Sequence, residues 1–280
     1  MNNRQKLKRA DLGIDLVRLL SSEGHRIFSI ERAREFGPRL GLKESYLLES
    51  LYHLRRNGWL LPLRRGLYAV SPSVPGVTPS HEFEIAMALV EPAAISHWSA
   101  LHHHGLTEQT PRTVFVLTTT ETAIPRLRGS KASQAKNGYP VAGTLYHFIQ
   151  VKPGRFFGTE KVWVGDARVT ITDPERTLLD GLSRPQYCGD FAEVLHAFQV
   201  RGEQLNLERI IGYALRLDEA TTAKRLGWVL EKQGIDLPKL GPLLQAPINS
   251  YRTLDPTGTR EGPYNRRWMI QENLPGKLKA

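Results

Sequence analysis

The sequence predicts an α+β protein with two domains, and three observations lead to this prediction. Residues 1–70 read as three amphipathic helices followed by two short strands. A segment rich in Pro, Gly and Ser follows at residues 71–80, which is typical of a linker. The longer remainder places a cluster of strands before a run of helices, the segregation that characterises α+β folds.

Charge is concentrated in the first part of the chain. The net charge of the 280 residues is +10, and residues 1–70, with 14 Lys and Arg against 7 Asp and Glu, contribute +7 of it. A small, strongly basic domain of this kind indicates a polyanionic partner such as nucleic acid.

Composition also excludes several classes of protein. With 40% hydrophobic residues, the chain is not expected to be disordered. No apolar run is long enough for a transmembrane helix, so no membrane partner is expected. The basic N-terminus lacks the apolar stretch of a signal peptide, and the single Cys188 rules out an internal disulfide framework. A cytoplasmic location is therefore expected.

The small domain has a recognisable order of elements. Apolar spacing predicts helices over residues 11–22, 31–40 and 43–56, with a short extended step at Phe28–Ile30 before the second helix. Strands are expected over 59–63 and 67–70. The tight turn between them is Arg64-Arg65-Gly66.

Three helices followed by a β-hairpin is the layout of a winged helix-turn-helix, whose third helix enters the major groove of DNA. Side chains at both ends of that helix and at the hairpin tip are placed for base and phosphate contacts. The predicted DNA-binding residues are Lys43, Ser45, Tyr46, Arg55, Arg56, Arg64 and Arg65. The alternative is a winged helix that serves as a protein-interaction adaptor, with these arginines only solvated.

The expected boundaries are a winged helix-turn-helix domain at 1–72, a linker at 73–80 and a larger mixed α/β domain at 81–280. In the larger domain, helices are expected at 81–90 and 94–106, ahead of the sheet. The other elements are strands at 112–118, 145–151, 161–164 and 168–171, and helices at 173–182, 191–199, 207–217 and 220–233. With no heptad seam visible, a monomer in solution is expected.

Two further basic segments lie in the larger domain. The polar stretch 125–140 contains Arg126, Arg128 and Lys131, and the tail 247–280 interleaves arginines, including Arg266 and Arg267, with Tyr and Trp. Such mixtures bind nucleic acid by stacking and phosphate contact. They form a possible second surface for nucleic acid or a toxin partner, although a tail bearing Tyr and Trp more commonly wraps its own domain.

Evidence for catalysis is weak in this sequence. His102, His103 and His104 point about 100° apart on a helix, so they cannot share one metal ion. The chain has no phosphate-binding glycine loop and no GxSxG motif. We therefore expect no enzyme, no catalytic residue, no metal and no cofactor. The rival hypothesis is a metal-dependent nuclease using Asp173, Glu175 and His97, with the winged helix as its targeting module.

Several motifs together resemble one family, the AbiEi-type antitoxins of type IV toxin–antitoxin and abortive-infection systems, also described as predicted transcriptional regulators of viral defence. The resemblance covers most of the chain. Its motifs lie at Phe28–Ile30, Leu51–Leu60, Arg64–Tyr68, Ile95–Leu101, His103–Leu106, Ile171–Asp180 and Ser250–Arg267.

The resemblance implies a two-domain antitoxin. Its winged helix would bind inverted repeats in its own promoter and repress the operon. Its C-terminal domain would counter a cognate nucleotidyltransferase toxin without requiring a stable complex. No catalytic residue carries over from the family.

Overall fold

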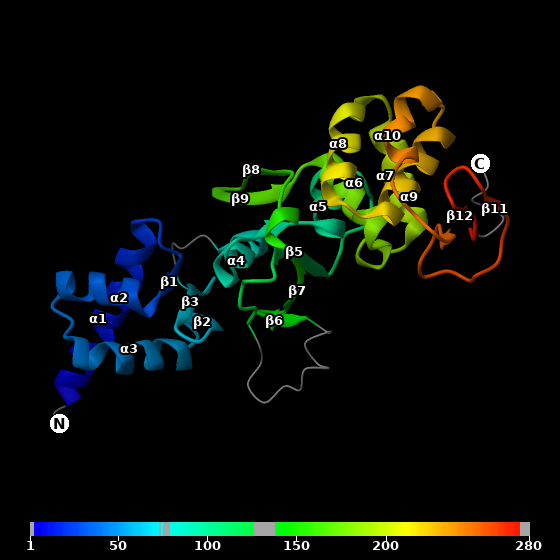
Figure 1. Cartoon of the computed structure of the whole chain (residues 1–280). Helices are drawn as coiled ribbons and strands as arrows, with labels where there is room; N and C mark the ends of the chain where they lie inside the picture. The colour runs from blue at the N-terminus through cyan, green and yellow to red at the C-terminus, as the bar shows by residue number, and fades with distance from the viewer. Residues whose placement is uncertain (1–2, 73, 75–78, 126–137, 275–280) are drawn as a thin grey trace. The chain divides into compact units, whose positions relative to one another are not determined.

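The structure is a computed structural model that describes residues 3–72, 74, 79–125 and 138–274, with side chains from Leu12 onward. It is a mixed α+β protein, as the sequence predicts (Figure 1). The chain divides into two compact units, and three of the six strands of the largest sheet contribute residues to both. The first unit comprises Met1–Glu91, Ala123–Tyr146 and Trp163–Val169, and the second comprises Pro92–Thr122, His147–Val162 and Thr170–Ala280.

The N-terminal elements follow the predicted order closely. The helices are α1 (Asn3–Ser22), α2 (Ile30–Phe36) with the 3-10 turn Gly37–Leu40, and α3 (Glu44–Arg56). Strands β1 (Ile27–Ser29), β2 (Leu60–Arg64) and β3 (Leu67–Val70) form an antiparallel sheet in the order β1-β3-β2. The expected helix at 11–22 begins earlier, at Asn3.

Apolar residues at helical spacing explain why these elements pack together. Leu16 and Leu20 of α1 and Leu47, Leu51 and Leu54 of α3 are buried in one cluster. Their i, i+4 and i+7 spacing places them on one face of each helix. Ser29 begins α2, because its hydroxyl accepts a hydrogen bond from Arg32 N at 3.2 Å.

The first unit contains more than the predicted N-terminal domain. It includes α4 (Glu82–Leu89) and β6 (Tyr139–Val141). The Tyr139 hydroxyl donates a hydrogen bond to Leu63 O at 2.7 Å, and Arg26 forms a salt bridge of 2.7 Å with Asp166. The separate domain at 1–72 therefore stays a prediction, and part of the expected linker (73 and 75–78) lies outside the described residues.

The largest sheet has the order β6-β7-β5-β4-β9-β8. Its other strands are β4 (Ala94–Ile95), β5 (Thr113–Thr119), β7 (Thr144–Val151), β8 (Thr159–Val164) and β9 (Ala167–Thr172). The prediction of a single helix over 94–106 was wrong. Strand β4 occupies the first part of this range, and the helix α5 (His97–His103) follows it. Ile95 pairs with Val116 on one side and Ile171 on the other, so tertiary pairing overrides the local helical pattern.

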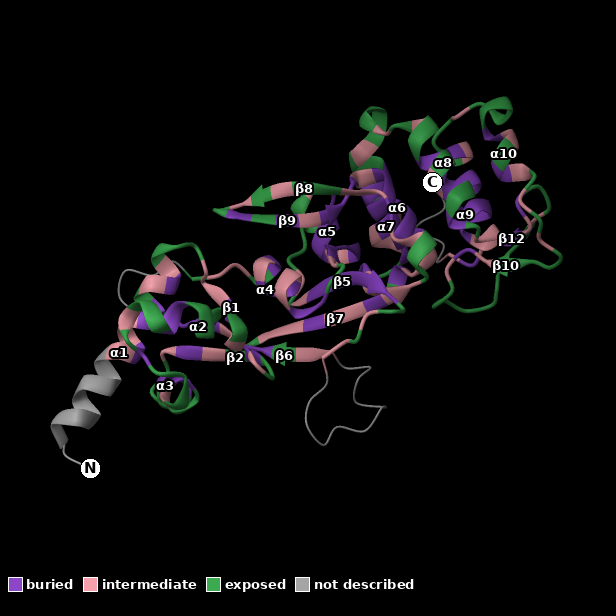
Figure 2. Cartoon of the chain, turned by 60° about the vertical axis from the view of Figure 1, so that its left-hand side comes forward, coloured by how far each residue is buried: buried purple, intermediate pink, exposed green. Residues whose placement is uncertain are grey.

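Helices of the second unit follow the sheet. They are α6 (Pro174–Ser183), α7 (Phe191–Arg201), α8 (Leu207–Leu217), α9 (Ala220–Lys232) and the short α10 (Gly241–Leu244). Helix α6 is buried from Glu175 to Leu182 (Figure 2). Its start is the one the sequence predicts, because Asp173 caps it and Pro174 occupies its first turn.

The tail packs onto its own unit. Short strands β10 (Arg252–Thr253), β11 (Tyr264–Asn265) and β12 (Ile270–Gln271) form a small sheet, and Trp268 is fully buried in the helical core. The Trp268 indole N–H donates to Glu231. Among the described helices, none is long and apolar enough to cross a membrane.

Candidate nucleic-acid interface

Helix α3 presents an exposed stripe opposite its buried face. Ser45, Leu48, Tyr52 and Arg55 follow one another three or four positions apart, so they lie on the same side of the helix. Leu48 is 55% exposed and Tyr52 is 57% exposed. Large apolar side chains grouped on one exposed helix face are typical of a binding surface.

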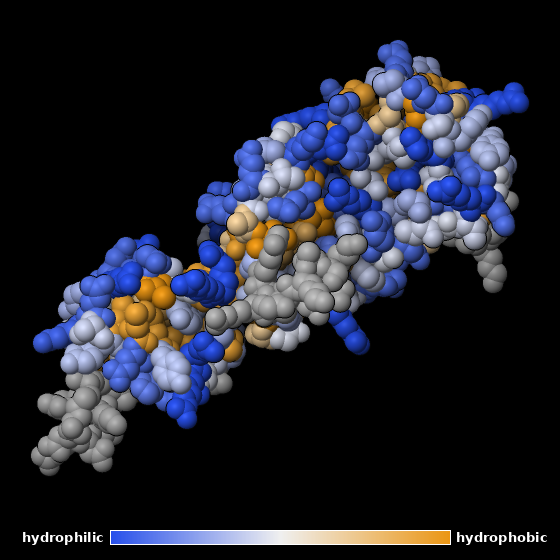
Figure 3. Space-filling view, turned by 60° about the horizontal axis from the view of Figure 1, so that its bottom comes forward, coloured by the Kyte–Doolittle hydropathy of each residue, from blue (hydrophilic) through white to orange (hydrophobic). Residues whose placement is uncertain are grey.

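Figure 3 turns the underside of Figure 1 toward the reader and shows an apolar area bordered by hydrophilic side chains over the N-terminal helices. The cations of this region are Lys43 before α3, Arg55 and Arg56 at its end, and Arg64 and Arg65 in the hairpin. All are exposed, and none forms a salt bridge with another residue of the described part.

Three nearby arginines, in contrast, form salt bridges with carboxylates of the protein. Arg32 pairs with Glu35 at 2.6 Å, Arg34 pairs with Glu44 at 3.2 Å, and Arg39 pairs with Glu23 at 2.5 Å. Cations without a salt bridge in this region are thus concentrated at the two ends of α3 and in the hairpin. Such charge is available for phosphate groups.

The hairpin tip depends on Gly66. Its φ of +76° lies in the left-handed region, which favours glycine, so the chain reverses directly after Arg64 and Arg65. Both arginine side chains are exposed at this reversal.

Three residues of α3, namely Tyr46, Leu48 and Tyr52, differ from the predicted set of interface residues. Tyr46, expected at the interface, is half-buried and packs against the N-terminal core, whereas Ser45 beside it is exposed. Leu48 and Tyr52 were not among the residues predicted for the interface. The buried stripe at Leu47, Leu51 and Leu54 fixes which side of α3 faces outward, and this signal could have identified them.

The expected second surface is only partly described. Arg126, Arg128 and Lys131 lie outside the described residues. Arg266 is exposed, while Arg267 forms an ion pair with Glu231, the same carboxylate that accepts from Trp268. At the tail, therefore, one of the two predicted arginines already has a partner within the fold.

The carboxylates of the nuclease hypothesis have protein partners. Asp173 accepts from Arg176 N at 2.8 Å and from the Tyr213 hydroxyl at 2.7 Å. Glu175 accepts from Arg201 at 3.0 Å and from Asn206 N at 3.1 Å. Burial alone would raise the pKa of Glu175, but these hydrogen bonds hold it below its usual value.

Potential metal ligands do not converge in the described part of the chain. Within it, no group of three or more His, Cys, Asp or Glu side chains is placed to hold a metal ion. Cys188 is fully buried, and burial raises the pKa of its thiol well above the usual value. Its environment is that of a packed core thiol.

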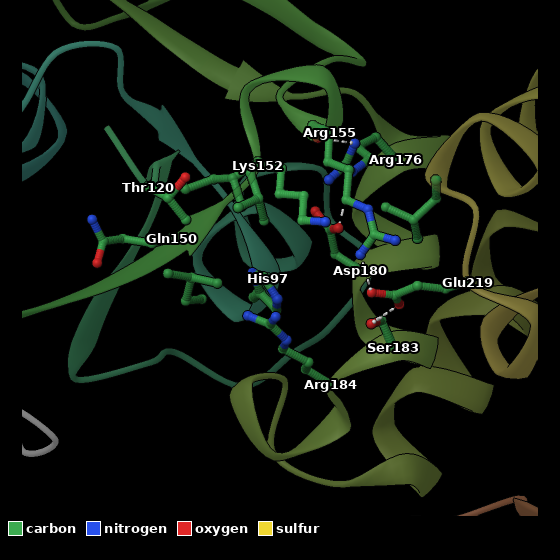
Figure 4. A pocket seen from close by; sticks show the side chains of 14 residues that line it. His97, Thr120, Gln150, Lys152, Arg155, Arg176, Asp180, Ser183, Arg184 and Glu219 are labelled. Atoms are coloured by element: carbon green, nitrogen blue, oxygen red, sulfur yellow. Dashed lines mark hydrogen bonds and ion pairs between the residues drawn. The ribbon is translucent and has the colours of Figure 1, made fainter. Parts of the chain in front are cut away.

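A polar pocket lies in the second unit, beside α6 (Figure 4). Its volume is about 170 Å³, and its polar lining is His97, Thr120, Gln150, Lys152, Arg155, Arg176, Asp180, Ser183, Arg184 and Glu219. The Arg176 side chain is fully buried. Its Nε donates to Asp180 Oδ1 at 2.9 Å, and its Nη1 donates to the carbonyls of Arg155 at 2.9 Å and Phe157 at 3.2 Å.

His97 stands at the edge of this pocket in a strained conformation, with a φ of +50°. Its Nδ1 lies 2.9 Å from the Ser96 hydroxyl. Burial, together with the positive charges of Arg184 and Arg176, lowers its pKa well below the usual value. His97 is therefore neutral at pH 7.

A solved structure of another protein has a similar fold. The chain is similar to the crystal structure of the RV2827C protein from Mycobacterium tuberculosis, with a TM-score of 0.65. The similarity covers 91% of this chain and 88% of that chain, at 14% sequence identity. At this identity the likeness concerns the fold alone. No family model and no curated protein matches the sequence.

Proposed function

We propose that the chain is a DNA-binding transcriptional regulator whose N-terminal residues 1–72 act as a winged helix-turn-helix. The observation that carries the proposal is the exposed stripe of α3, flanked by cations without salt bridges. The order α1-β1-α2-α3-β2-β3 supports it, because a winged helix places its reading helix directly before the hairpin.

In this proposal, α3 enters the major groove. Ser45 hydrogen-bonds to base edges, while Leu48 and Tyr52 contact apolar base surfaces such as the thymine methyl group. Lys43, Arg55 and Arg56 contact phosphates at the two ends of the helix. Arg64 and Arg65 extend from the hairpin to the backbone or the adjacent minor groove.

The wider role we propose is that of a cytoplasmic autorepressor and antitoxin. The resemblance to AbiEi-type antitoxins supports this role through motifs in both units, including Arg64–Tyr68 in the first and Ile171–Asp180 in the second. The regulator would bind inverted repeats upstream of its own gene and counter a nucleotidyltransferase toxin, without acting as an enzyme itself.

Binding to the DNA directly upstream of the gene tests the regulator. Fluorescence anisotropy should give an affinity about a thousandfold tighter for that DNA than for a scrambled duplex of equal length. Equal and weak binding to both duplexes would overturn the proposal and favour the adaptor alternative.

Co-expression tests the antitoxin role separately. If a nucleotidyltransferase gene adjoins this one, its induction alone should arrest growth, and co-expression of the full chain should restore it. A matched variant, Arg64→Met with Arg65→Met, separates the two roles, because it should lose repression while leaving the second unit intact. Failure of the wild-type chain to restore growth would remove the antitoxin role and leave the DNA-binding proposal standing.

A further inference from the structure

The pocket beside α6 holds buried polar groups that the fold leaves unsatisfied. Arg176 Nη2 and Asp180 Oδ2 have no hydrogen-bond partner among the described residues. The side chains of Arg176 and Asp180 are 0% and 7% exposed, and both residues line the pocket. Buried polar atoms without partners cost free energy, so they are rare unless a ligand or another polar group pairs with them.

The pocket also carries surplus positive charge. Of its cations, Arg176 pairs with Asp180 at 2.9 Å and Arg155 pairs with Glu219 at 2.7 Å. Lys152 and Arg184 form no salt bridge within the described residues, and His97 is neutral. The lining therefore has a net charge of +2, which Lys152 and Arg184 supply.

The charge of Arg184 acts on two other groups that line the pocket, His97 and Asp180. Burial raises the pKa of Asp180, and the positive charges of Arg176 and Arg184 oppose that rise. Burial lowers the pKa of His97, and the charge of Arg184 adds to that effect. Figure 4 shows Arg184 and Lys152 coming from different elements around the same space as Asp180. The strained backbone of His97 lies in the same wall, and such strain is concentrated at ligand-binding sites.

We propose that this pocket binds a phosphate group, either as a phosphomonoester or as free phosphate. A phosphomonoester carries about −1.5 to −2 charges at pH 7, which matches the surplus of Lys152 and Arg184. The guanidinium of Arg184 can hold two phosphate oxygens at once, and Lys152 supplies a point charge. Arg176 and Asp180, which also line the pocket, add a buried guanidinium and a buried carboxylate to its wall.

The volume of the pocket restricts the size of the ligand that can bind. A volume of about 170 Å³ is similar to that of a cavity of about 150 Å³ that holds a benzene molecule. A phosphate group with part of a sugar fits this space, and the remainder of a larger ligand would extend into solvent. The proposal does not depend on DNA binding by the first unit.

Calorimetry on the full-length chain tests the proposal. Ribose 5-phosphate is titrated in one arm, inorganic phosphate in a second and unphosphorylated ribose in a third. Saturable binding in either phosphate arm, with none for ribose, supports the phosphate site, and the stronger of the two arms identifies an organic or a free phosphate as the ligand. No saturable binding of either phosphate at millimolar concentration would overturn it.

Variants then locate the site. Arg184→Met should weaken phosphate binding about 10- to 100-fold, because it removes hydrogen bonds to a charged group. Lys161→Met is the matched control: Lys161 is exposed in the second unit and lies outside the pocket, so affinity should stay within about twofold. Arg184→Lys keeps the charge without the bidentate geometry and should give an intermediate affinity.

Two results would contradict this location. Equal losses in Arg184→Met and Lys161→Met would indicate general charge attraction instead of a built site. Unchanged affinity in an Arg184→Met chain that retains its thermal unfolding midpoint would exclude the pocket.

Discussion

Arg176 Nε and Asp180 Oδ1 are 2.9 Å apart, one turn from each other on the buried helix α6. The same guanidinium donates to the carbonyls of Arg155 and Phe157 and lies over the Phe157 ring, with Cζ 4.4 Å from the ring centroid. One side chain thus connects α6 to the segment that follows β7. This link holds the wall of the pocket in place.

Breaking this pair should destabilise the protein strongly. Asp180→Asn leaves the Arg176 charge buried without a counter-charge, so the free energy of unfolding should fall by about 3–5 kcal/mol. Urea denaturation measures the change. Glu35→Gln is the control, because its pair with Arg32 is exposed and should contribute less than about 1 kcal/mol. Similar small losses in both variants would show that the buried pair does not support the fold.

Docking of the tail depends on Gly227 of α9. A Cβ at this position would lie 1.9 Å from the ring of the fully buried Trp268. Gly227→Ala should therefore force Trp268 out of place and lower the free energy of unfolding by about 1–3 kcal/mol or more.

Gly212 in α8 offers the matched control, because a Cβ there meets nothing within 4 Å. Gly212→Ala should raise the free energy of unfolding by about 0.5–1 kcal/mol through the better helix propensity of alanine. Thermal and urea unfolding of both variants, followed by Trp fluorescence, give the comparison. A Gly227→Ala chain as stable as the wild type would contradict the packing of Trp268.

Acid should destabilise the fold through His97. Because burial keeps this residue neutral in the folded chain, the unfolded chain takes up a proton below its pKa of 6.5 and the folded chain does not. The unfolded state then binds more protons, so the free energy of unfolding falls as the pH drops below about 6.5. At pH 5.5 the protein should therefore be less stable than at pH 7.5, and His97 should supply part of that loss.

Urea denaturation at pH 7.5 and 5.5 measures this loss. His97→Asn should reduce the difference between the two pH values, and asparagine tolerates the positive φ at this position. His102→Gln is the control, because His102 is exposed on the same helix and its replacement should leave the difference largely intact. If His97→Asn keeps the full difference, the buried neutral histidine is not its source.

The exposed stripe of α3 should govern sequence recognition. Tyr52→Ala should weaken binding to the upstream DNA by about 1–3 kcal/mol and relax discrimination at one position, without changing the unfolding midpoint. Anisotropy titrations with single-base variants of the duplex measure both effects. Leu215→Ala serves as the control, since Leu215 is 46% exposed and belongs to the second unit. Equal effects of the two substitutions would remove α3 from the interface.

Local chemistry made much of the fold predictable from the sequence. Asp173 followed by Pro174 predicts the start of α6, and the structure has it there. The strand predicted at 67–70 and the helix predicted at 207–217 are found with the same bounds. Each is bounded by residues whose caps or turns are decided locally, such as Gly66 and Asn206.

Features that depend on distant parts of the chain were not predictable. Ile95 is a strand residue because Val116 and Ile171 flank it, and neither partner is near it in sequence. The pocket escaped prediction for the same reason: Lys152, Arg176 and Arg184 come together only in the folded unit. At the candidate interface, the basic residues were predicted from their positions in the expected third helix and hairpin, whereas the exposure of Tyr46 and Tyr52 depends on which face of α3 is buried.

The most direct test of the central claim is the salt dependence of binding to the upstream DNA. In the double variant Arg64→Met with Arg65→Met, the negative slope of log K against log salt should become shallower by about two, because two phosphate contacts are lost. The control, Arg112→Met, replaces an exposed arginine of the second unit and should leave the slope unchanged. An unchanged slope and affinity in the double variant would contradict phosphate contacts by the hairpin, and with them the proposed winged-helix mode of DNA binding.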